Sequence, residues 1–144
     1  MDTGESSRFN IRKFYSRDRQ GVIALWKDVF PDDPPWNDPA AVIARKMQKQ
    51  RDLFLVGLLD KKVVATVLGG YDGFRGWIYH LAVNPLFRSH GFGKKMMEAI
   101  ESILTKQGCI KINLQVRSGN SGVIKFYQHI GYSVEDHASL GKKL

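Results

Sequence analysis

The sequence predicts a single α/β (α+β) domain in which helices cover a mixed, mostly antiparallel sheet. The chain has 144 residues and is 43% hydrophobic, so one domain can bury a sizeable core. Short apolar runs joined by turn residues predict hairpins, and later runs alternate with amphipathic segments as in β-α-β units. The expected order is β-α-α-β-β-β-α-β-α-β-β. It corresponds to about six or seven strands flanked by about four helices.

The N-terminal part predicts a tail, a strand and a helix. Residues 1–8 are polar and are expected to form a flexible tail before the domain of residues 9–144. Alternation predicts a short strand at 9–14. A helix should follow, with Ser16 as its capping residue. Its apolar residues recur at helical spacing and are Val22, Leu25, Trp26 and Val29.

The middle of the chain predicts a second helix and two hairpins. Prolines end the first helix, and Asn37-Asp38-Pro39 is typical of the start of the next. Apolar runs at 53–59 and 63–69 predict one hairpin, since a short polar turn joins them. A turn at 71–76 leads to a return strand at 77–83.

The C-terminal part predicts an alternation of helices and strands. Gly108 and Gly131 each follow an amphipathic segment and are expected to end it. The predicted helices lie at 91–107 and 121–130, and the predicted strands at 110–116, 132–135 and 138–144.

Composition and charge limit the class of protein. The net charge is +8, and residues 61–144 hold twelve basic and five acidic residues. This excess of basic residues favours an anionic partner, namely nucleic acid, an acidic surface or a small polyphosphate. A basic face that is merely solvated has the same pattern. No membrane span and no signal peptide are expected. The single cysteine, Cys109, excludes an internal disulfide, fits a reducing cytoplasm and is expected to be a buried thiol.

The strongest chemical signal is the segment 81–94, where a strand enters a glycine-containing turn that opens a long helix. The first turn of a helix has unpaired N–H groups and a partial positive charge, which bind anions. Gly91 and Gly93 would let a phosphate approach the backbone, and Arg88 and Lys94 add positive charge. A tight turn that needs glycine only for packing is the alternative. Neither Rossmann nor Walker spacing is present.

A second segment carries Asn120, Val123, Tyr127, Gly131 and Tyr132. Together with the pattern Arg-x-x-Gly-x-Gly of the first segment, it resembles the GNAT family of acetyl-CoA-dependent N-acetyltransferases. The family's later helix has Asn-x-x-Ala-x-x-x-Tyr-x-x-x-Gly-Phe/Tyr, and here valine replaces the alanine. Finer features resemble the bacterial YpeA-type branch. The segment Leu114-Gln115-Val116-Arg117-Ser118 also resembles the ribosomal-protein N-terminal acetyltransferases, which have Glu where this chain has Gln115.

The resemblance implies a GNAT fold and transfer of an acetyl group from acetyl-CoA to a primary amine by direct attack in a ternary complex. The acceptor would be a small-molecule amine or a protein or peptide amine. Monomer and homodimer both stay open, and no metal is expected. The residues implied in cofactor binding are Leu81, Ala82, Val83, Arg88, Ser89, His90, Gly91, Phe92, Gly93, Lys94 and Asn120.

Two residues are the catalytic candidates. The resemblance implies that Tyr127 is the general acid that gives the leaving thiolate a proton or a hydrogen bond, although a core aromatic on an amphipathic helix has the same pattern. His80 is the candidate base, either directly or through water, with a half-buried structural histidine as the alternative. Strict alternation would point His80 away from the side of Tyr79 and Leu81. Gln115 cannot titrate and is no base.

Two other functions remain open. The first is a GNAT-like protein that binds acyl-CoA without catalysis, as a sensor or regulatory subunit, which the glutamine at 115 suggests. The second is a nucleic-acid module, suggested by the basic half, although no known nucleic-acid motif is present. Trp36 and Trp77 are candidates for the acceptor side, with ordinary packing as the alternative.

Overall fold

A computed structural model of the chain describes residues 8–144. The expected N-terminal tail therefore lies, except for Arg8, outside the described residues. The chain divides into two compact units, the first ending at Leu114 and the second spanning Gln115–Leu144. Each unit is described by itself, and the organisation of residues 9–144 as one domain stays a prediction.

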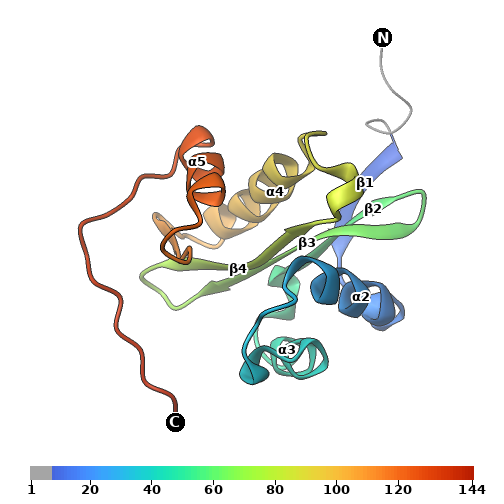
Figure 1. Cartoon of the computed structure of the whole chain (residues 1–144), viewed down its shortest axis with the longest axis horizontal. Helices are drawn as coiled ribbons and strands as arrows, with labels where there is room; N and C mark the ends of the chain where they lie inside the picture. The colour runs from blue at the N-terminus through green and yellow to red at the C-terminus, as the bar shows by residue number, and fades with distance from the viewer. Residues whose placement is uncertain (1–7) are drawn as a thin grey trace. The chain divides into compact units, whose positions relative to one another are not determined.

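The first unit is built on a five-stranded mixed sheet in the order β1-β2-β3-β4-β5 (Figure 1). Its first four strands pair antiparallel, and β5 is parallel to β4. This arrangement confirms the predicted mixed α/β class. The strands are β1 (Phe9–Lys13), β2 (Phe54–Leu59), β3 (Lys62–Tyr71), β4 (Gly76–Val83) and β5 (Ile112–Leu114).

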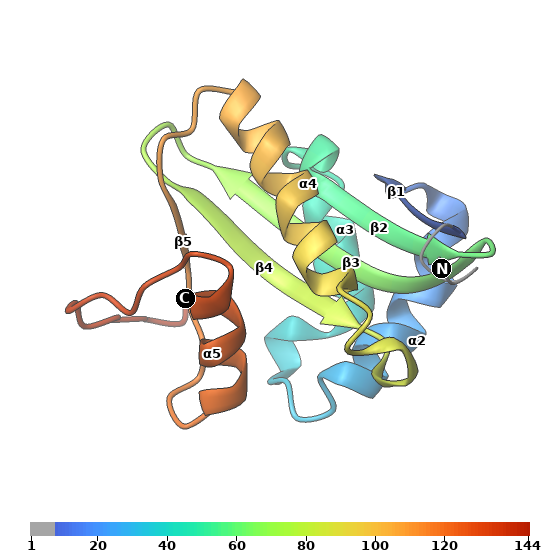
Figure 2. The same ribbon diagram turned by 90° about the horizontal axis from the view of Figure 1, so that it is seen from above.

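Helices cover both faces of this sheet. Two helices, α2 (Arg19–Val29) and α3 (Pro39–Lys46), lie on one face, and α4 (Phe92–Lys106) lies on the other (Figure 1). From above, α4 runs along the strands of the sheet (Figure 2). The helix α5 (Ser121–His129) belongs to the second unit.

Burial explains why these segments fold as they do. Every residue of β2 is buried, because helices cover both of its faces. On the α2 and α3 face the core holds Trp26 and Phe54. On the α4 face Phe92 stacks on Phe9 with their ring centroids 4.0 Å apart. Apolar residues at helical spacing therefore supply one layer on each side of the sheet.

The predicted helix boundaries are mostly confirmed. The Asp38 side chain accepts the Ala41 N–H, and Pro39 is the first residue of α3. Gly108 and Gly131 follow α4 and α5 with positive φ, as helix-ending glycines do.

The predicted Ser16 cap is wrong. Ser16 opens a short 3-10 turn, Ser16–Asp18, that precedes α2. The neighbouring Asp18 carboxylate accepts the Tyr15 N–H at 2.8 Å and pairs with the Arg12 guanidinium. Because this buried carboxylate organises the chain before the helix, α2 begins without a serine cap.

The two predicted C-terminal strands are wrong as well. Residues 132–144 contain no strand, so the sheet has five strands instead of six or seven. The apolar side chains in this segment bury little, since Val134 is 72% exposed and Leu140 is 94% exposed. The predicted strand 110–116 is also shorter, pairing only over Ile112–Leu114.

Candidate active site

A β-bulge in β4 positions the first candidate residue. Thr66 pairs with Ala82 and Leu68 pairs with Tyr79, so that two residues of β4 stand opposite one residue of β3. One of them, His80, has a left-handed backbone with a φ of 50°. A bulge of this kind leaves its extra residue unpaired and re-aims side chains.

The bulge turns the His80 ring to the face that α2 covers. The Tyr79 ring lies near Gly70 and Gln50 on this same face. The prediction that His80 points away from the side of Tyr79 is therefore wrong, since the extra residue interrupts the alternation on which it rested.

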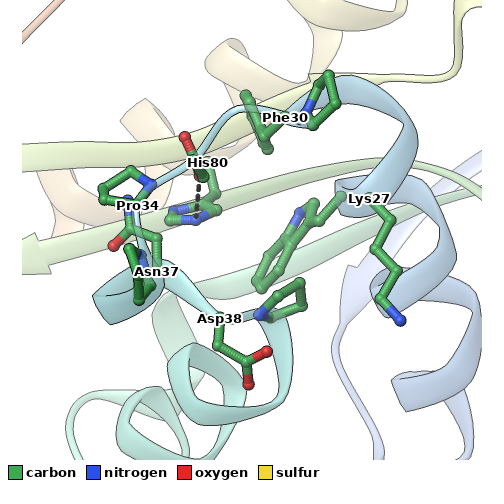
Figure 3. Close-up of a pocket in the computed structure, with 11 residues that line it drawn as sticks. Lys27, Phe30, Pro34, Asn37, Asp38 and His80 are labelled. Atoms are coloured by element: carbon green, nitrogen blue, oxygen red, sulfur yellow. Dashed lines mark ion pairs between the residues drawn. The ribbon is translucent and has the colours of Figure 1, made fainter.

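His80 lies among aromatic rings. Its ring centroid is 4.5 Å from that of Trp26 and 5.4 Å from that of Phe30. Its side chain is 12% exposed, and Nε2 lies 4.0 Å from Oδ2 of Asp33 (Figure 3). Burial lowers the pKa of His80 below its usual 6.5, and the Asp33 carboxylate opposes that change. In this environment the neutral form of the imidazole is favoured, and this form can accept a proton.

Two hydrogen bonds connect the bulge to α2. The Trp26 Nε1–H donates to Thr66 Oγ1 at 2.8 Å, and the Thr66 hydroxyl donates to the His80 carbonyl oxygen at 2.9 Å. Thr66 and Trp26 are both fully buried or nearly so. The single hydroxyl therefore satisfies a buried indole and fixes the backbone of the bulge.

Replacing Thr66 with valine is expected to lower the free energy of unfolding by about 1–3 kcal/mol, because the buried indole N–H then has no acceptor. The shape of the side chain is nearly conserved, so packing contributes little. Urea unfolding measures the loss. Thr66→Ser keeps the hydroxyl and serves as the control, and an equal loss in both variants would contradict the hydrogen-bond explanation.

A cavity of about 220 Å³ opens beside the His80 ring. It lies between the end of α2, the proline-rich loop that follows it and the start of α3 (Figure 3). Aromatic and proline side chains form much of its wall, and carboxylates stand on the loop side. Its lining includes Trp26, Phe30, Asp33, Pro34, Asp38 and His80. Neither Trp36 nor Trp77 lines this cavity.

The edge of β4 that faces β5 is only partly paired. The ladder with β5 runs from Gly76 to Ile78 and stops there. Among the described residues, no strand pairs with residues 79–83 on that side. This part of β4 holds Leu81, Ala82 and Val83, whose backbone groups are thus available to an extended ligand.

The turn after β4 has the geometry that suits an anion. Ser89 and Gly91 both have positive φ, at 68° and 78°. Gly91 is the residue before α4, and a Cβ placed on it would meet no atom within 4 Å. The space beside Gly91, where α4 begins and its first amides lack intrahelical partners, is therefore open. The exposed side chains of Arg88 and Lys94 flank them.

Four further candidates lie in β4, in this turn and in the first turn of α4. Phe92 is 1% exposed and Ala82 is 2% exposed, so their side chains belong to the core. The His90 Nδ1–H donates to the Phe87 carbonyl at 2.9 Å, which holds the turn closed. Gly93 lies in the first turn of α4. Each of these residues could contribute an amide or carbonyl to a ligand.

The remaining candidates lie in the second unit. The Asn120 side chain accepts the Val123 N–H at 3.4 Å at the start of α5 and caps this helix. Tyr127 is buried against the rings of Phe126 and Tyr132. Burial raises the pKa of Tyr127 to about 12. This phenol keeps its proton at neutral pH and can donate it in a hydrogen bond.

No group of three His, Cys, Asp or Glu in residues 8–144 could hold a metal ion. No helix there has the length and apolar character needed to cross a membrane. Cys109 is half-buried, not fully buried as predicted, and its thiol contacts the Lys111 carbonyl.

The sequence analysis missed Asp33 and Thr66. Asp33 lies in a proline-rich loop. The signal available for it in the sequence was that this loop contains acidic residues and no basic one. Thr66 lies within an apolar run and carried no signal, because its role depends on an indole forty positions away.

Comparisons with known proteins agree on one family. A model described as "Acetyltransferase (GNAT) family" matches residues 13–132. An acetyltransferase from Yersinia enterocolitica is 41% identical over 136 residues, which cover 93% of this chain and 94% of the relative.

Solved structures share the fold. The PaiA N-acetyltransferase from Thermoplasma acidophilum, in complex with coenzyme A, has a TM-score of 0.80 at 20% identity. The match covers 90% of this chain and 92% of that one. Ard1 from Thermoplasma volcanium has a TM-score of 0.79 at 24% identity, with 89% and 84% covered.

Proposed function

Because the chain belongs to the acetyltransferase (GNAT) family, we propose that it moves the acetyl group of acetyl-CoA directly to a primary amine. The amine nitrogen attacks the thioester carbon, a C–N bond forms and the C–S bond breaks. The amine loses a proton and the thiolate leaves, so no covalent enzyme intermediate is needed. The acceptor is a small-molecule amine or a protein or peptide amine.

The single observation that carries the cofactor assignment is the turn that opens α4. The space beside Gly91 is open, Ser89 and Gly91 have positive φ, and the start of a helix favours an anion such as a pyrophosphate. Arg88 and Lys94 add charge, while Ser89 and His90 complete the turn. The partly paired edge of β4 would bind the pantetheine chain through Leu81 and Val83.

The chemistry then needs three groups. A backbone N–H near Leu81 would stabilise the developing oxyanion, an effect of roughly 3–4 kcal/mol for one good donor. His80 would take the amine proton, which its buried neutral ring supports. Tyr127 would donate to the departing sulfur, a role supported by the motif and by the raised pKa. Asn120, the cap of α5, remains a candidate cofactor contact.

Thermal unfolding with acetyl-CoA tests the cofactor site. Acetyl-CoA at about 100 times its Kd should add roughly 2.7 kcal/mol to stability, a shift of several degrees. Gly91→Ala should abolish most of this shift, because the new Cβ fills the space that the phosphates need. The strain of a left-handed alanine should also cost about 1–2 kcal/mol.

A matched variant separates strain from binding. Gly73 also has positive φ, at 96°, and open space around it, but lies in the loop between β3 and β4. Gly73→Ala should lose similar stability and keep the acetyl-CoA shift. Absence of a shift in the unaltered protein at millimolar acetyl-CoA would overturn the cofactor site. A shift without turnover of any amine would favour the non-catalytic sensor.

A further inference from the structure

The cavity beside His80 has an electrostatic character opposite to that of the whole chain. The chain carries a net charge of +8, yet residues 28–38 contain four aspartates and no lysine or arginine. Of the charged groups that line the cavity, Asp33 and Asp38 are acidic and Lys27 is basic. With His80 neutral, the cavity has a net negative charge, which favours a cation.

The two carboxylates of the lining have different roles. Asp38 accepts the Ala41 N–H at 3.2 Å as the cap of α3. Asp33 is the carboxylate that faces the His80 ring, and the dashed line in Figure 3 marks this pair. The catalytic candidate and an anionic group therefore share one end of the cavity.

The distance within this pair points to a ligand between the two groups. Nε2 and Oδ2 are 4.0 Å apart, which is too long for a direct hydrogen bond. A nitrogen at about 2.8 Å from each atom fits between them, because a tetrahedral ammonium can donate in two directions at once. The imidazole and the carboxylate would then accept one N–H each.

The residues that line the cavity determine which substituent on the ammonium nitrogen can fit. Trp26, Phe30 and Pro34 present rings, and the volume is small. An apolar arm fits against such walls, and a second anionic group on the ligand would be repelled by Asp33 and Asp38.

We propose that the acceptor enters this cavity as a primary ammonium on an uncharged apolar arm, bound between His80 Nε2 and Asp33 Oδ2, and that amines with an adjacent carboxylate are excluded. This inference rests on the proposed transfer of an acetyl group and names its acceptor class. Asp33 holds the ammonium and His80 accepts the proton that leaves it. Free α-amino acids are therefore poor acceptors, while alkylamines, arylalkylamines and amine groups flanked by amides are good ones.

Three compounds with the same arm test the charge rule on the full chain. Phenethylamine has no carboxylate, phenylalanine has one beside the amine, and phenylalaninamide replaces it by a neutral amide. The expected kcat/KM for phenethylamine and phenylalaninamide is at least about tenfold higher than for phenylalanine, a difference of about 1.4 kcal/mol. Equal or better use of phenylalanine would overturn the proposal and leave acetyl transfer intact.

Neighbouring aspartates provide a matched pair of variants. Asp33→Asn should raise the KM for phenethylamine at least tenfold and reduce the discrimination against phenylalanine. Asp32 is exposed and does not line the cavity, so Asp32→Asn changes the net charge equally and should alter KM by less than about twofold. Equal effects of the two variants would overturn the role of Asp33. The compound series stands by itself if Asp33→Asn fails to fold.

A binding measurement separates this inference from the proposed function. Calorimetry with the same three amines on the CoA-saturated chain reports binding without turnover. Binding of phenethylamine in preference to phenylalanine without any transfer would support the cavity assignment and contradict the catalytic one. The absence of both binding and transfer of phenethylamine would overturn the inference.

Discussion

Replacing His80 with glutamine is expected to lower kcat for acetyl transfer by about 100-fold or more, the usual contribution of a positioned general base. An amine must lose its proton to form the amide product. The His80 ring is the titratable group at the aromatic end of the cavity proposed to take the acceptor, and burial favours its neutral form. Glutamine can still donate and accept hydrogen bonds there, but it cannot take a proton.

The controls separate this role from packing. The His80 ring lies against Trp26 and Phe30, so glutamine removes some stability, which thermal unfolding measures directly. The acetyl-CoA shift should persist, because the cofactor turn is a different part of the chain. His137 is exposed, and His137→Gln should leave kcat within about twofold. An unchanged kcat in His80→Gln would make the histidine structural.

The pH profile gives an independent readout. Burial lowers the pKa of His80 below 6.5. The ring is therefore protonated, and can no longer act as a base, only at pH values below 6.5. The wild-type rate should decline there, and His80→Gln should lack this decline. Stability follows the same sign, because the unfolded chain binds the proton more readily and unfolding is favoured as pH falls below 6.5.

Local sequence signals predicted much of the frame around this site. Capping residues and helix-ending glycines depend on the backbone of a few neighbours, so the start of α3 at Asp38 and the end of α4 before Gly108 could be predicted. The turn around Gly91 is equally local. Its amides and its positive φ follow from a glycine placed between a strand and a helix.

The cavity beside His80 could not be predicted in this way. The bulge adds a residue to β4, and alternation alone has no means of locating it. The side on which His80 lies therefore depends on the register with β3, which is a long-range property. Asp33 lies in the loop after α2 and lines the cavity, and α2 packs Trp26 against the same bulge. The prediction of strands at 132–135 and 138–144 failed for a related reason. The apolar residues there, such as Val134, stay exposed, and no strand of the described sheet pairs with them.

Replacing Tyr127 with phenylalanine is expected to lower kcat by about 100-fold while the KM for acetyl-CoA changes by less than about threefold. The ring contacts with Phe126 and Tyr132 are kept, so only the hydroxyl is lost. Tyr132→Phe is the matched control, since the family motif accepts either ring at that position. It should retain nearly full activity.

The pKa of Tyr127 decides which step the hydroxyl assists. At about 12, it lies well above the roughly 8.5 of an ordinary thiol, so complete proton transfer to the departing thiolate is unfavourable. In the proposed mechanism the hydroxyl would act by donating a hydrogen bond that strengthens as negative charge develops on sulfur. One such donor is worth about 10²–10³ in kcat, which sets the expected loss. If Tyr127→Phe instead raised KM and spared kcat, the phenol would serve cofactor binding, and the thiolate would have to leave without help from this side chain.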